Sequence, residues 1–466
     1  MAHDIESLKS SAEQFMKFQK SANMKELKSV LKNFGPIGKF ENIDHRAALI
    51  EILGNNNDDV RMLAVKNLAK YADEELKQLL LTVIEKDPSS MVRRESVSAI
   101  GRMRSKNCIT DLYNLLEHSD PVVVQQAIRG LLVFKKDEEH GEAVSKNLID
   151  LRSHPNETIQ DVIEKEFFEE SKSSSTPHES VDLRLKNVVV NADVIETLGV
   201  IDSESIHLTF TSPPYYNARD YSIYSSYQEY LDFLKKVFEE THRVTKEGRF
   251  LIVNTSPVIV PRFSRAYASK RYPIPFDLHP ILISMGWEFI DDIVWEKPES
   301  SVKARNNGFF QHRKPLAYKP NSVTEMVMVY RKKTSRLIDW NVKQYEDEII
   351  DNSKVSDGYA TSNLWKISPS NDSVHSAIFP DELCDRIVQY YSLEGDLVFD
   401  PFGGSGTFGI SALRNGRNFF LTEIDQDYVN RMKDRFSKLK FPISSIQIPQ
   451  APEFLSLNQF KELYEN

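Results

Sequence analysis

The alternation of apolar and polar residues divides the chain into two parts. Residues 44–170 carry apolar positions at helical spacing, in pairs of helices separated by polar or Asp-Pro turns. From residue 183 onward, short apolar runs rich in β-branched residues alternate with amphipathic helices, a pattern typical of an α/β domain with a mostly parallel sheet. Between the two, residues 169–178 have the Glu-, Ser- and Pro-containing composition of a linker. We therefore expect two domains of different class.

The helical part contains an internal repeat. Asp59-Val60-Arg61, Met91-Val92-Arg93 and Val123-Val124-Gln125 stand at equivalent places, with their central valines 32 residues apart, and a looser copy follows at Thr158-Ile159-Gln160. Paired helices with a period in the thirties predict an α-solenoid, in which each repeat buries its apolar face against its neighbours. The pattern resembles HEAT repeats. We assign the solenoid to residues 1–165 and expect it to position DNA or a protein partner.

Two of the predicted strands end in turns that could bind a ligand or carry catalytic residues. Residues 206–210 run into Thr211-Ser212-Pro213-Pro214-Tyr215-Tyr216, where two prolines cannot continue a β-ladder and turn the chain out of the sheet. Residues 397–400 run into Pro401-Phe402-Gly403-Gly404-Ser405-Gly406-Thr407 and then a helix, an arrangement that lets a ligand approach the backbone. The next strand ends at Glu423, an acid placed to bond ribose hydroxyls. In open α/β sheets, ligands bind at these carboxyl ends.

Together these stretches resemble the amino-methylating DNA methyltransferases, which use S-adenosylmethionine. Thr211-Ser212-Pro213-Pro214-Tyr215 is similar to the catalytic motif of that family, and residues 399–407 are similar to its cofactor loop. The catalytic motif precedes the cofactor motif, as in the circularly permuted β group. Further matches lie at Asn191-Ala192-Asp193, at residues 286–297, at residues 324–330 and at residues 375–380. The resemblance covers residues 183–440.

This resemblance implies a fold and its division. The fold class is an α/β Rossmann-like methyltransferase domain with a mixed, mostly parallel sheet, preceded by the all-α HEAT-like solenoid. The catalytic half is expected at residues 183–334, a target-recognition segment at 335–364 and the cofactor half at 365–440. Residues 166–182 then form the linker, and residues 441–466 a C-terminal tail.

The resemblance also implies roles for individual residues. The catalytic set is Ser212, Pro213, Pro214 and Tyr215. The expected contacts of S-adenosylmethionine are Asp193, Thr211, Phe379, Pro380, Asp400, Phe402, Gly404, Ser405, Gly406, Thr407 and Glu423, and no metal is expected. In this scheme the target base is flipped out of the duplex and stacks on Tyr215, while the Ser212 hydroxyl and the Pro213 carbonyl accept its two amino hydrogens. The nitrogen lone pair then faces the methyl group without a covalent enzyme intermediate.

Serine at position 212 favours cytosine N4 as the methyl acceptor. Ser-Pro-Pro-Tyr resembles the cytosine-N4 enzymes, whereas Asp-Pro-Pro-Tyr is the usual adenine-N6 form. Adenine N6 is the alternative, because serine and aspartate both offer a hydrogen-bond acceptor at this point. An alternative of another class is a solenoid interaction protein whose methyltransferase fold is catalytically silent, and a third is methylation of RNA or free nucleotide. A DNA enzyme would either act alone or protect a genome beside a cognate restriction endonuclease.

The distribution of charged residues indicates which part of the chain could bind DNA. The 466 residues carry a net charge of −9, which argues against a uniformly basic binding protein. Residues 261–336, however, hold 14 Lys and Arg against 7 Asp and Glu, and a local basic surface is sufficient for duplex DNA. The expected DNA contacts are Tyr216, Arg262, Arg265, Lys270, Arg271, Lys303, Arg305, Arg313 and Lys314.

Other classes of protein fit the sequence poorly. No apolar run approaches the roughly 18 residues that a membrane span needs, and the N-terminus lacks the basic and apolar regions of a secretory signal. Cys108 and Cys384 fall in different predicted domains, so we expect buried reduced thiols and no disulfide or zinc framework. These features predict a cytoplasmic protein.

Overall fold

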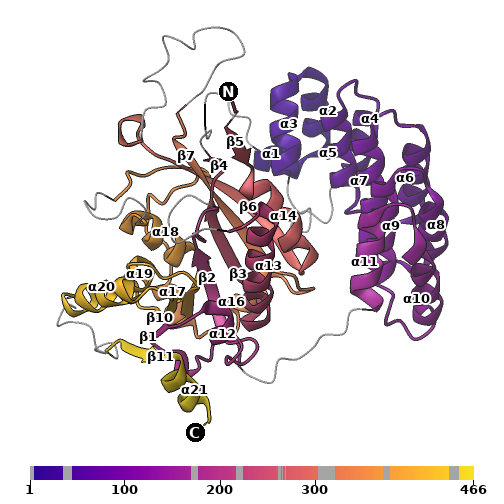
Figure 1. Ribbon diagram of the computed structural model, residues 1–466. Helices are drawn as coiled ribbons and strands as arrows, with labels where there is room; N and C mark the ends of the chain where they lie inside the picture. Colours follow the sequence, from indigo (N-terminus) through magenta and orange to yellow (C-terminus); the bar gives the residue numbers. More distant parts are fainter. Residues whose placement is uncertain are drawn as a thin grey trace. The chain divides into compact units, whose positions relative to one another are not determined.

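The chain folds into two compact units, Met1–Ser171 and Lys172–Asn466 (Figure 1). The computed structural model describes residues 5–34, 45–168, 177–216, 224–260, 264, 266–267, 269–302, 321–370, 378–439 and 451–465. Within these ranges, no helix has both the length and the apolar character needed to cross a membrane.

The first unit is helical throughout its described residues. Its α-helices are α1 (Ile5–Ser10), α2 (Ala12–Ser21), α3 (Met24–Asn33), α4 (Arg46–Ile52), α5 (Asp58–Leu68), α6 (Glu74–Lys86), α7 (Ser90–Arg102), α8 (Ile109–Asn114), α9 (Pro121–Leu132), α10 (Gly141–Ile149) and α11 (Glu157–Phe167). The repeated valines Val60, Val92 and Val124 lie on α5, α7 and α9 and are fully buried. Because α7 packs against both α5 and α9, the equivalent helices of successive repeats stack, which confirms the predicted solenoid.

Successive repeats are joined by the same polar link. Arg61 on α5 forms two hydrogen bonds of 2.8 and 2.9 Å with the Asp87 carboxylate, which precedes α7. Arg94 on α7 forms two of 3.0 and 3.1 Å with Asp120, the N-cap residue of α9. Paired hydrogen bonds between a guanidinium and a carboxylate add directional specificity to apolar packing. They therefore set the register between neighbouring repeats.

The second unit is built around a nine-stranded sheet in the order β11-β1-β10-β9-β2-β3-β7-β6-β8. The strands are β1 (Val188–Asn191), β2 (Ile206–Thr211), β3 (Thr245–Thr255), β6 (Trp287–Glu296), β7 (Thr324–Lys332), β8 (Leu364–Lys366), β9 (Leu397–Asp400), β10 (Asn418–Glu423) and β11 (Glu453–Ser456). A separate two-stranded ribbon consists of β4 (Val258–Val260) and β5 (Lys270–Tyr272). Strand β7 runs antiparallel to both of its neighbours, and the other pairings in the large sheet are parallel. The predicted mixed, mostly parallel sheet is confirmed.

Helices cover both faces of this sheet (Figure 1). The α-helices of this unit are α12 (Val194–Leu198), α13 (Tyr227–Val244), α14 (Ile274–Ser284), α16 (Ile338–Val342), α17 (Asp347–Asn352), α18 (Asp381–Tyr391), α19 (Thr407–Arg414), α20 (Gln426–Ser437) and α21 (Leu457–Glu465). Alternate residues of a strand enter different cores. Val189 packs in the cluster that holds α18, α19 and α20, whereas Val188 and Val190 pack in the one that holds α12 and α21. A parallel strand covered on both sides explains the continuous apolar runs in the sequence.

The C-terminal segment departs from the expected tail. Strand β11 pairs in parallel with β1, with Glu453 opposite Val188. Helix α21 buries Phe460 completely, and the Phe460 ring stacks on Phe420 with 5.6 Å between centroids. The expected boundary at residue 440 is therefore wrong, because residues 453–465 contribute a strand and a helix to the α/β unit.

Candidate active site

The serine-proline turn and the glycine turn follow neighbouring strands. Strands β2 and β9 pair in parallel, with Leu208 opposite Val398. Both leave the sheet at its carboxyl edge, where Thr211 Oγ1 donates a hydrogen bond of 2.7 Å to Asp400 Oδ1. The sheet continues from β2 to β3 on one side and from β9 to β10 on the other, so the order reverses between the two turns. Open α/β sheets bind their ligands at such a reversal point.

The glycine turn is held in an open, left-handed conformation. Gly404 and Gly406 have φ angles of +53° and +78°, which favour glycine because a side chain is strained there. Glu423 Oε2 accepts a hydrogen bond of 2.8 Å from the Gly404 N–H, and Asp400 Oδ1 accepts one of 3.0 Å from the Phe402 N–H. A Cβ atom built on Gly404 would have no neighbour closer than 3.8 Å. The turn therefore leaves space for a ligand beside its backbone.

Two carboxyl groups at this turn are strongly affected by burial. Asp400 is 3% exposed, and burial raises its pKa to about 7, although the hydrogen bonds from Thr211 and the Phe402 N–H act in the opposite direction. Burial also raises the pKa of Glu423. Among the described side chains, neither carboxylate forms an ion pair. Two acids without a cation suit a ligand that carries hydroxyl groups and a positive charge, as S-adenosylmethionine does.

Ser405 and Thr407, both expected to contact the cofactor, bind a side chain of the protein in the ligand-free structure. Arg435 on α20 donates from Nη1 to Ser405 Oγ, to the Ser405 carbonyl and to Thr407 Oγ1, each at 2.8 Å. Both hydroxyls therefore help to shape the glycine turn.

The remaining residues expected at the cofactor lie around the same edge of the sheet. Asp193 follows β1, the neighbour of β10, and its Oδ1 caps α12 by accepting hydrogen bonds of 2.8 and 3.1 Å. Phe379 stacks on Phe210 of β2 with 4.6 Å between ring centroids. Pro380 is the buried N-cap residue of α18.

The catalytic turn ends in a polar cluster that the sequence analysis did not identify. Tyr215 donates its hydroxyl hydrogen to Glu325 Oε2 at 3.1 Å. Glu325 also accepts a hydrogen bond of 2.5 Å from Asn254 Nδ2, and it forms an ion pair with Lys297. Asn254 is near the end of β3, Glu325 is near the start of the antiparallel β7, and Lys297 directly follows β6. Lys297 and Glu325 fall within the stretches 286–297 and 324–330 that resemble the family, but nothing in the sequence joined them to Asn254 and Tyr215.

Tyr216 does not have the predicted role. Its side chain is 6% exposed and packs among other tyrosines, with ring centroids 5.2 Å from Tyr227 and 4.7 Å from Tyr272. Tyr227 and Tyr230 lie on α13, so Tyr216 fastens the turn to this helix. The prediction that Tyr216 contacts DNA is wrong because the ring is enclosed by this aromatic cluster.

Two of the basic residues predicted to contact DNA lie within the described part of the structure. Lys270 and Arg271 are exposed on β5, which pairs with β4. Because β4 begins three residues after β3 ends, this ribbon follows the same carboxyl edge as the catalytic turn. The other predicted basic contacts lie outside the described residues, and they are Arg262, Arg265, Lys303, Arg305, Arg313 and Lys314.

The segment expected to recognise the target is partly placed at the opposite edge of the sheet. Asn341 and Tyr345 are buried there: Asn341 Nδ2 donates to the Glu247 carbonyl at 3.0 Å, and Tyr345 donates to Asp396 Oδ1 at 2.5 Å. Glu247 is near the start of β3, and Asp396 directly precedes β9. This part of residues 335–364 therefore packs at the far side of the sheet from the two turns.

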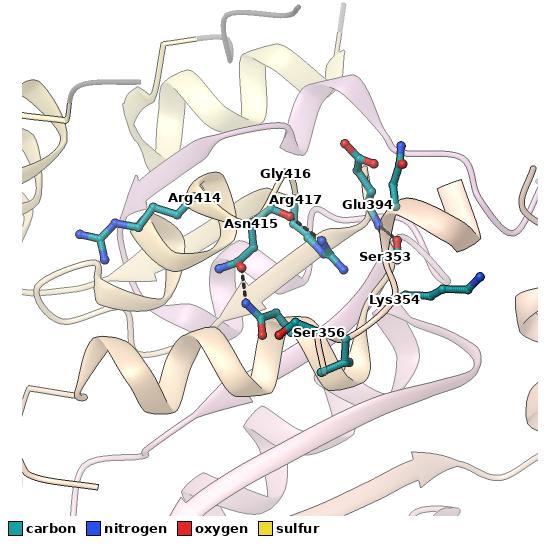
Figure 2. A pocket seen from close by; sticks show the side chains of 11 residues that line it. Ser353, Lys354, Ser356, Glu394, Arg414, Asn415, Gly416 and Arg417 are labelled. Carbon is teal, nitrogen blue, oxygen red and sulfur yellow. Dashed lines mark hydrogen bonds between the residues drawn. The ribbon is translucent and has the colours of Figure 1, made fainter. Parts of the chain in front are cut away.

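A cavity of about 510 Å³ also lies at this opposite edge (Figure 2). Its lining includes Ser353 and Glu394, whose N–H donates to Ser353 Oγ at 2.8 Å, and Asn415, which accepts a hydrogen bond of 2.8 Å from Gln389. Glu394 and Asn415 precede β9 and β10, whereas the two turns follow β2 and β9. The cavity is therefore separate from the candidate active site.

Comparison with known proteins matches parts of the chain to two families. The family described as DNA methylase matches residues 206–434, and the family described as HEAT repeats matches residues 78–164. The Type II beta methyltransferase M.BslI of Bacillus sp. (strain NEB-606) is 26% identical over 262 residues, which are 54% of this chain and 27% of that protein. The Type II methyltransferase M.Cfr9I of Citrobacter freundii is 28% identical over 301 residues, which are 56% of this chain and 93% of that protein.

Similar solved structures include the PvuII DNA methyltransferase (cytosine-N4-specific), with a TM-score of 0.42 and 20% identity over 62% of this chain and 94% of that chain. The chain spans about a quarter of the length of M.BslI and nearly all of M.Cfr9I. The family match includes the serine-proline turn, the glycine turn and the strands that carry them. Residues 206–434 therefore match the DNA methylase family, and residues 78–164 in the first unit match HEAT repeats.

Proposed function

We propose that this protein transfers a methyl group from S-adenosylmethionine to the exocyclic amino group of a base in duplex DNA. The observation that carries the proposal is the contact between Thr211 and Asp400, which joins the serine-proline turn to the glycine turn. A methyl donor beside the glycine turn and an amino group at Ser212 would then meet in one crevice. Direct transfer depends above all on this alignment of the two reacting groups.

The glycine turn would hold the cofactor, which supplies the methyl group. The open space at Gly404 admits a ligand against the backbone, and Glu423 offers carboxylate oxygens to ribose hydroxyls. Asp400 and Phe402 would lie near the methionine end. Asp193 and Phe379 would flank the ligand, since both lie at the same edge of the sheet.

The catalytic turn would hold the target base. The amino nitrogen is a poor nucleophile because its lone pair is conjugated with the ring. The Ser212 hydroxyl and the Pro213 carbonyl would each accept one amino hydrogen, so that the lone pair is directed at the methyl group. The Tyr215 ring would stack on the flipped base, which is worth roughly 1–3 kcal/mol in proteins that bind single strands.

We favour cytosine N4 over adenine N6 as the methyl acceptor because residue 212 is serine. Exposed Lys270 and Arg271 support a DNA contact beside the catalytic turn. Type II methyltransferases are among the relatives, and so is an orphan methyltransferase, M.BamHII of Bacillus amyloliquefaciens. We therefore propose genome marking, either beside a restriction endonuclease or alone, with the solenoid positioning DNA or a protein partner.

The test is methylation of unmethylated genomic DNA with methyl-labelled S-adenosylmethionine, followed by mass spectrometry of the nucleosides. We expect N4-methylcytosine from the wild type and none from Ser212→Ala. N6-methyladenine would instead support the adenine alternative. Competition with RNA tests the third alternative. Normal cofactor binding without any methylated product would show that the fold is catalytically silent.

A further inference from the structure

The polar cluster beside the catalytic turn is centred on the carboxylate of Glu325. Tyr215 and Asn254 both donate a hydrogen bond to Glu325 Oε2, at 3.1 and 2.5 Å, while Lys297 pairs with Oε1. Lys297 also lies over the Trp295 ring, at 4.7 Å from its centroid. Asn254 is 1% exposed, and the side chains of Glu325 and Lys297 are 14% and 18% exposed. Both carboxylate oxygens are therefore occupied, and their charge is balanced.

The sheet holds this carboxylate from both sides. Strand β7, which carries Glu325, lies between β3 and β6. Asn254 belongs to β3 and Lys297 directly follows β6, so the two partners reach Glu325 from opposite neighbours. An ion pair that is shielded from water and completed by further hydrogen bonds is directional. Glu325 Oε2 is therefore a fixed point at the carboxyl edge of the sheet.

The hydroxyl of Tyr215 is anchored at this point, whereas its side chain as a whole is partly exposed. The hydrogen of a phenol lies in the plane of the ring, because the oxygen is conjugated with it. A bond from that hydrogen to a fixed acceptor therefore restrains both the direction and the plane of the ring. Burial and the charge of Glu325 raise the pKa of Tyr215 well above its usual value, so the phenol keeps this hydrogen throughout the neutral pH range.

A stacking ring is more effective when its orientation is set before the base arrives. A base stacks on the flat face of an aromatic side chain, and a side chain that first has to be ordered costs binding free energy. A site for a planar ligand therefore benefits from a partner that locks its ring in advance. Pro213 and Pro214 restrict the backbone directly ahead of Tyr215, and Glu325 restricts its side chain.

We propose that Glu325 is a positioning residue that holds the Tyr215 ring in the orientation in which a flipped base stacks on it. This inference rests on the proposed function and deepens it, because it names the group that aligns the stacking ring. Lys297 and Asn254 act one step further away, by fixing the carboxylate. Glu325 and Lys297 need not touch the base to do this.

Asn254 indicates independently that the cluster borders a ligand crevice. Thr211 pairs with Val253 across the sheet, so Ser212 and Asn254 are the next residues at the carboxyl edge. Asn254 donates from Nδ2 to Glu325, and its Oδ1 is buried without a hydrogen-bond partner among the described residues. Reversing the amide would place its oxygen against the carboxylate, which determines the orientation. Because buried acceptors without partners are rare in proteins, this oxygen indicates that a ligand completes the cluster.

The experiment measures single-turnover methyl transfer to saturating unmethylated genomic DNA, with saturating methyl-labelled S-adenosylmethionine. Tyr215→Phe keeps the stacking ring and removes its anchor. Glu325→Gln keeps the shape of the acceptor, but only one of its two terminal atoms accepts hydrogen bonds, so it cannot serve Lys297 on one atom and Tyr215 with Asn254 on the other. We expect either change to slow transfer about 3- to 10-fold, because a ring that still packs against its neighbours loses only part of its alignment.

Two double variants separate this role from the charge of Glu325. Lys297→Met combined with Glu325→Gln removes both charges, and the amide oxygen is then free to accept from Tyr215 and Asn254, as Oε2 does in the wild type. We expect this neutral double variant to recover to within about 2-fold of the wild-type rate. Tyr215→Phe combined with Glu325→Gln should be no slower than the slower single variant, because both changes release the same ring.

A merely structural role would lower the stability or weaken binding. We expect the loss in the rate of transfer, with the KM for DNA, the Kd for S-adenosylmethionine and the Tm close to those of the wild type. The matched controls are Glu288→Gln on β6 and Tyr359→Phe, which change the same residue types at exposed positions. Neither control should change the rate.

The outcomes separate this inference from the proposed function. If the wild type methylates DNA and either Tyr215→Phe or Glu325→Gln keeps the full rate, the role of Glu325 is overturned and the proposed function stands. Failure of the neutral double variant to recover has the same meaning, because the charge of Glu325 would then matter in itself. A wild type that binds the cofactor but methylates no DNA overturns both. If Glu325→Gln lowers the Tm markedly, the rate of Tyr215→Phe decides alone, because that change removes a single oxygen atom.

Discussion

Thr211 and Asp400 are 189 residues apart in the chain, yet their side chains share a buried hydrogen bond of 2.7 Å at the carboxyl edge of the sheet. Thr211 is fully buried and Asp400 is 3% exposed, so water does not compete for the bond. The contact ties the residue before Ser212 to the residue that begins the glycine turn. Each half of the candidate site therefore sets the position of the other.

The first prediction concerns the acidity of Asp400. Burial raises its pKa to about 7, whereas an aspartate in an unfolded chain has a pKa of about 3.9. Between these values the native state binds a proton that the unfolded state has released, so Asp400 destabilises the native state as the pH rises. An asparagine amide in its place would keep the acceptor for Thr211 and would not ionise. We expect Asp400→Asn to raise the free energy of unfolding of the ligand-free protein at about pH 8 and to have little effect near pH 4.

Thermal unfolding across this pH range measures the effect. Thr211→Val is a useful comparison, because it removes the donor and should destabilise the protein by about 1–3 kcal/mol. If Asp400→Asn instead had a lower Tm than the wild type at about pH 8, the prediction would be wrong. The ionised Asp400 carboxylate would then stabilise the native state.

The second prediction separates the two halves of the site by function. Ser212→Ala removes the hydroxyl at the catalytic turn and should slow methyl transfer severely while the Kd for S-adenosylmethionine changes little. Asp400→Ala should weaken cofactor binding first. Single-turnover rates and titration calorimetry measure the two quantities, and the opposite result would show that the assignment of the halves is wrong.

The third prediction concerns Arg435, which shapes the glycine turn through Ser405 and Thr407. Arg435→Met keeps an apolar stem of similar reach and removes the donors. We expect weaker binding of S-adenosylmethionine by calorimetry, with a smaller loss for Ser405→Ala. The double variant should resemble Arg435→Met alone, because both changes act on one network. Additive losses would indicate that Ser405 contacts the cofactor directly.

The fourth prediction concerns the fully buried Asp396 at the opposite edge of the sheet. Burial acts to raise its pKa, but the charge of Arg249 and the hydrogen bond from Tyr345 outweigh this and hold the pKa below its usual value. The carboxylate therefore stabilises the fold above about pH 4, and this contribution is lost as the pH falls through its lowered pKa. Arg249→Met leaves the charge unpaired and should cost about 3–5 kcal/mol.

Urea unfolding at neutral pH measures the loss at Asp396. Combining Arg249→Met with Asp396→Asn should restore part of the stability, since no buried charge then remains unpaired. An equal loss in the double variant would mean that the packing of the Arg249 side chain, and not its charge, stabilises this edge.

The sequence predicted the features of the fold that depend on local pattern. The 32-residue spacing of Val60, Val92 and Val124 is sufficient to indicate stacked repeats, and the apolar run before Ser212 is sufficient to indicate a buried strand. Turns rich in proline or glycine mark where strands leave the sheet. The neighbouring positions of the serine-proline and glycine turns followed from the order of motifs in the related family.

Features that depend on distant contacts were missed. The cluster of Asn254, Lys297 and Glu325 forms because β7 runs antiparallel and brings its start beside the ends of its neighbours, and no local pattern reveals that direction. The long side chain of Arg435 reaches the glycine turn from another helix, so the hydroxyls of the turn looked available to a ligand. Tyr216 was expected to contact DNA for a similar reason, because its packing against Tyr227 and Tyr230 of helix α13 could not be predicted from the sequence.

Strand β11 has a practical consequence. It pairs with β1, which would otherwise be the outermost strand of the sheet. Strand β1 contains the successive valines Val188, Val189 and Val190. An uncovered strand of β-branched residues is a template for pairing with other molecules. Proteolytic clipping ahead of Glu453 should therefore cause the protein to aggregate during purification, even though every residue of the two turns is still present.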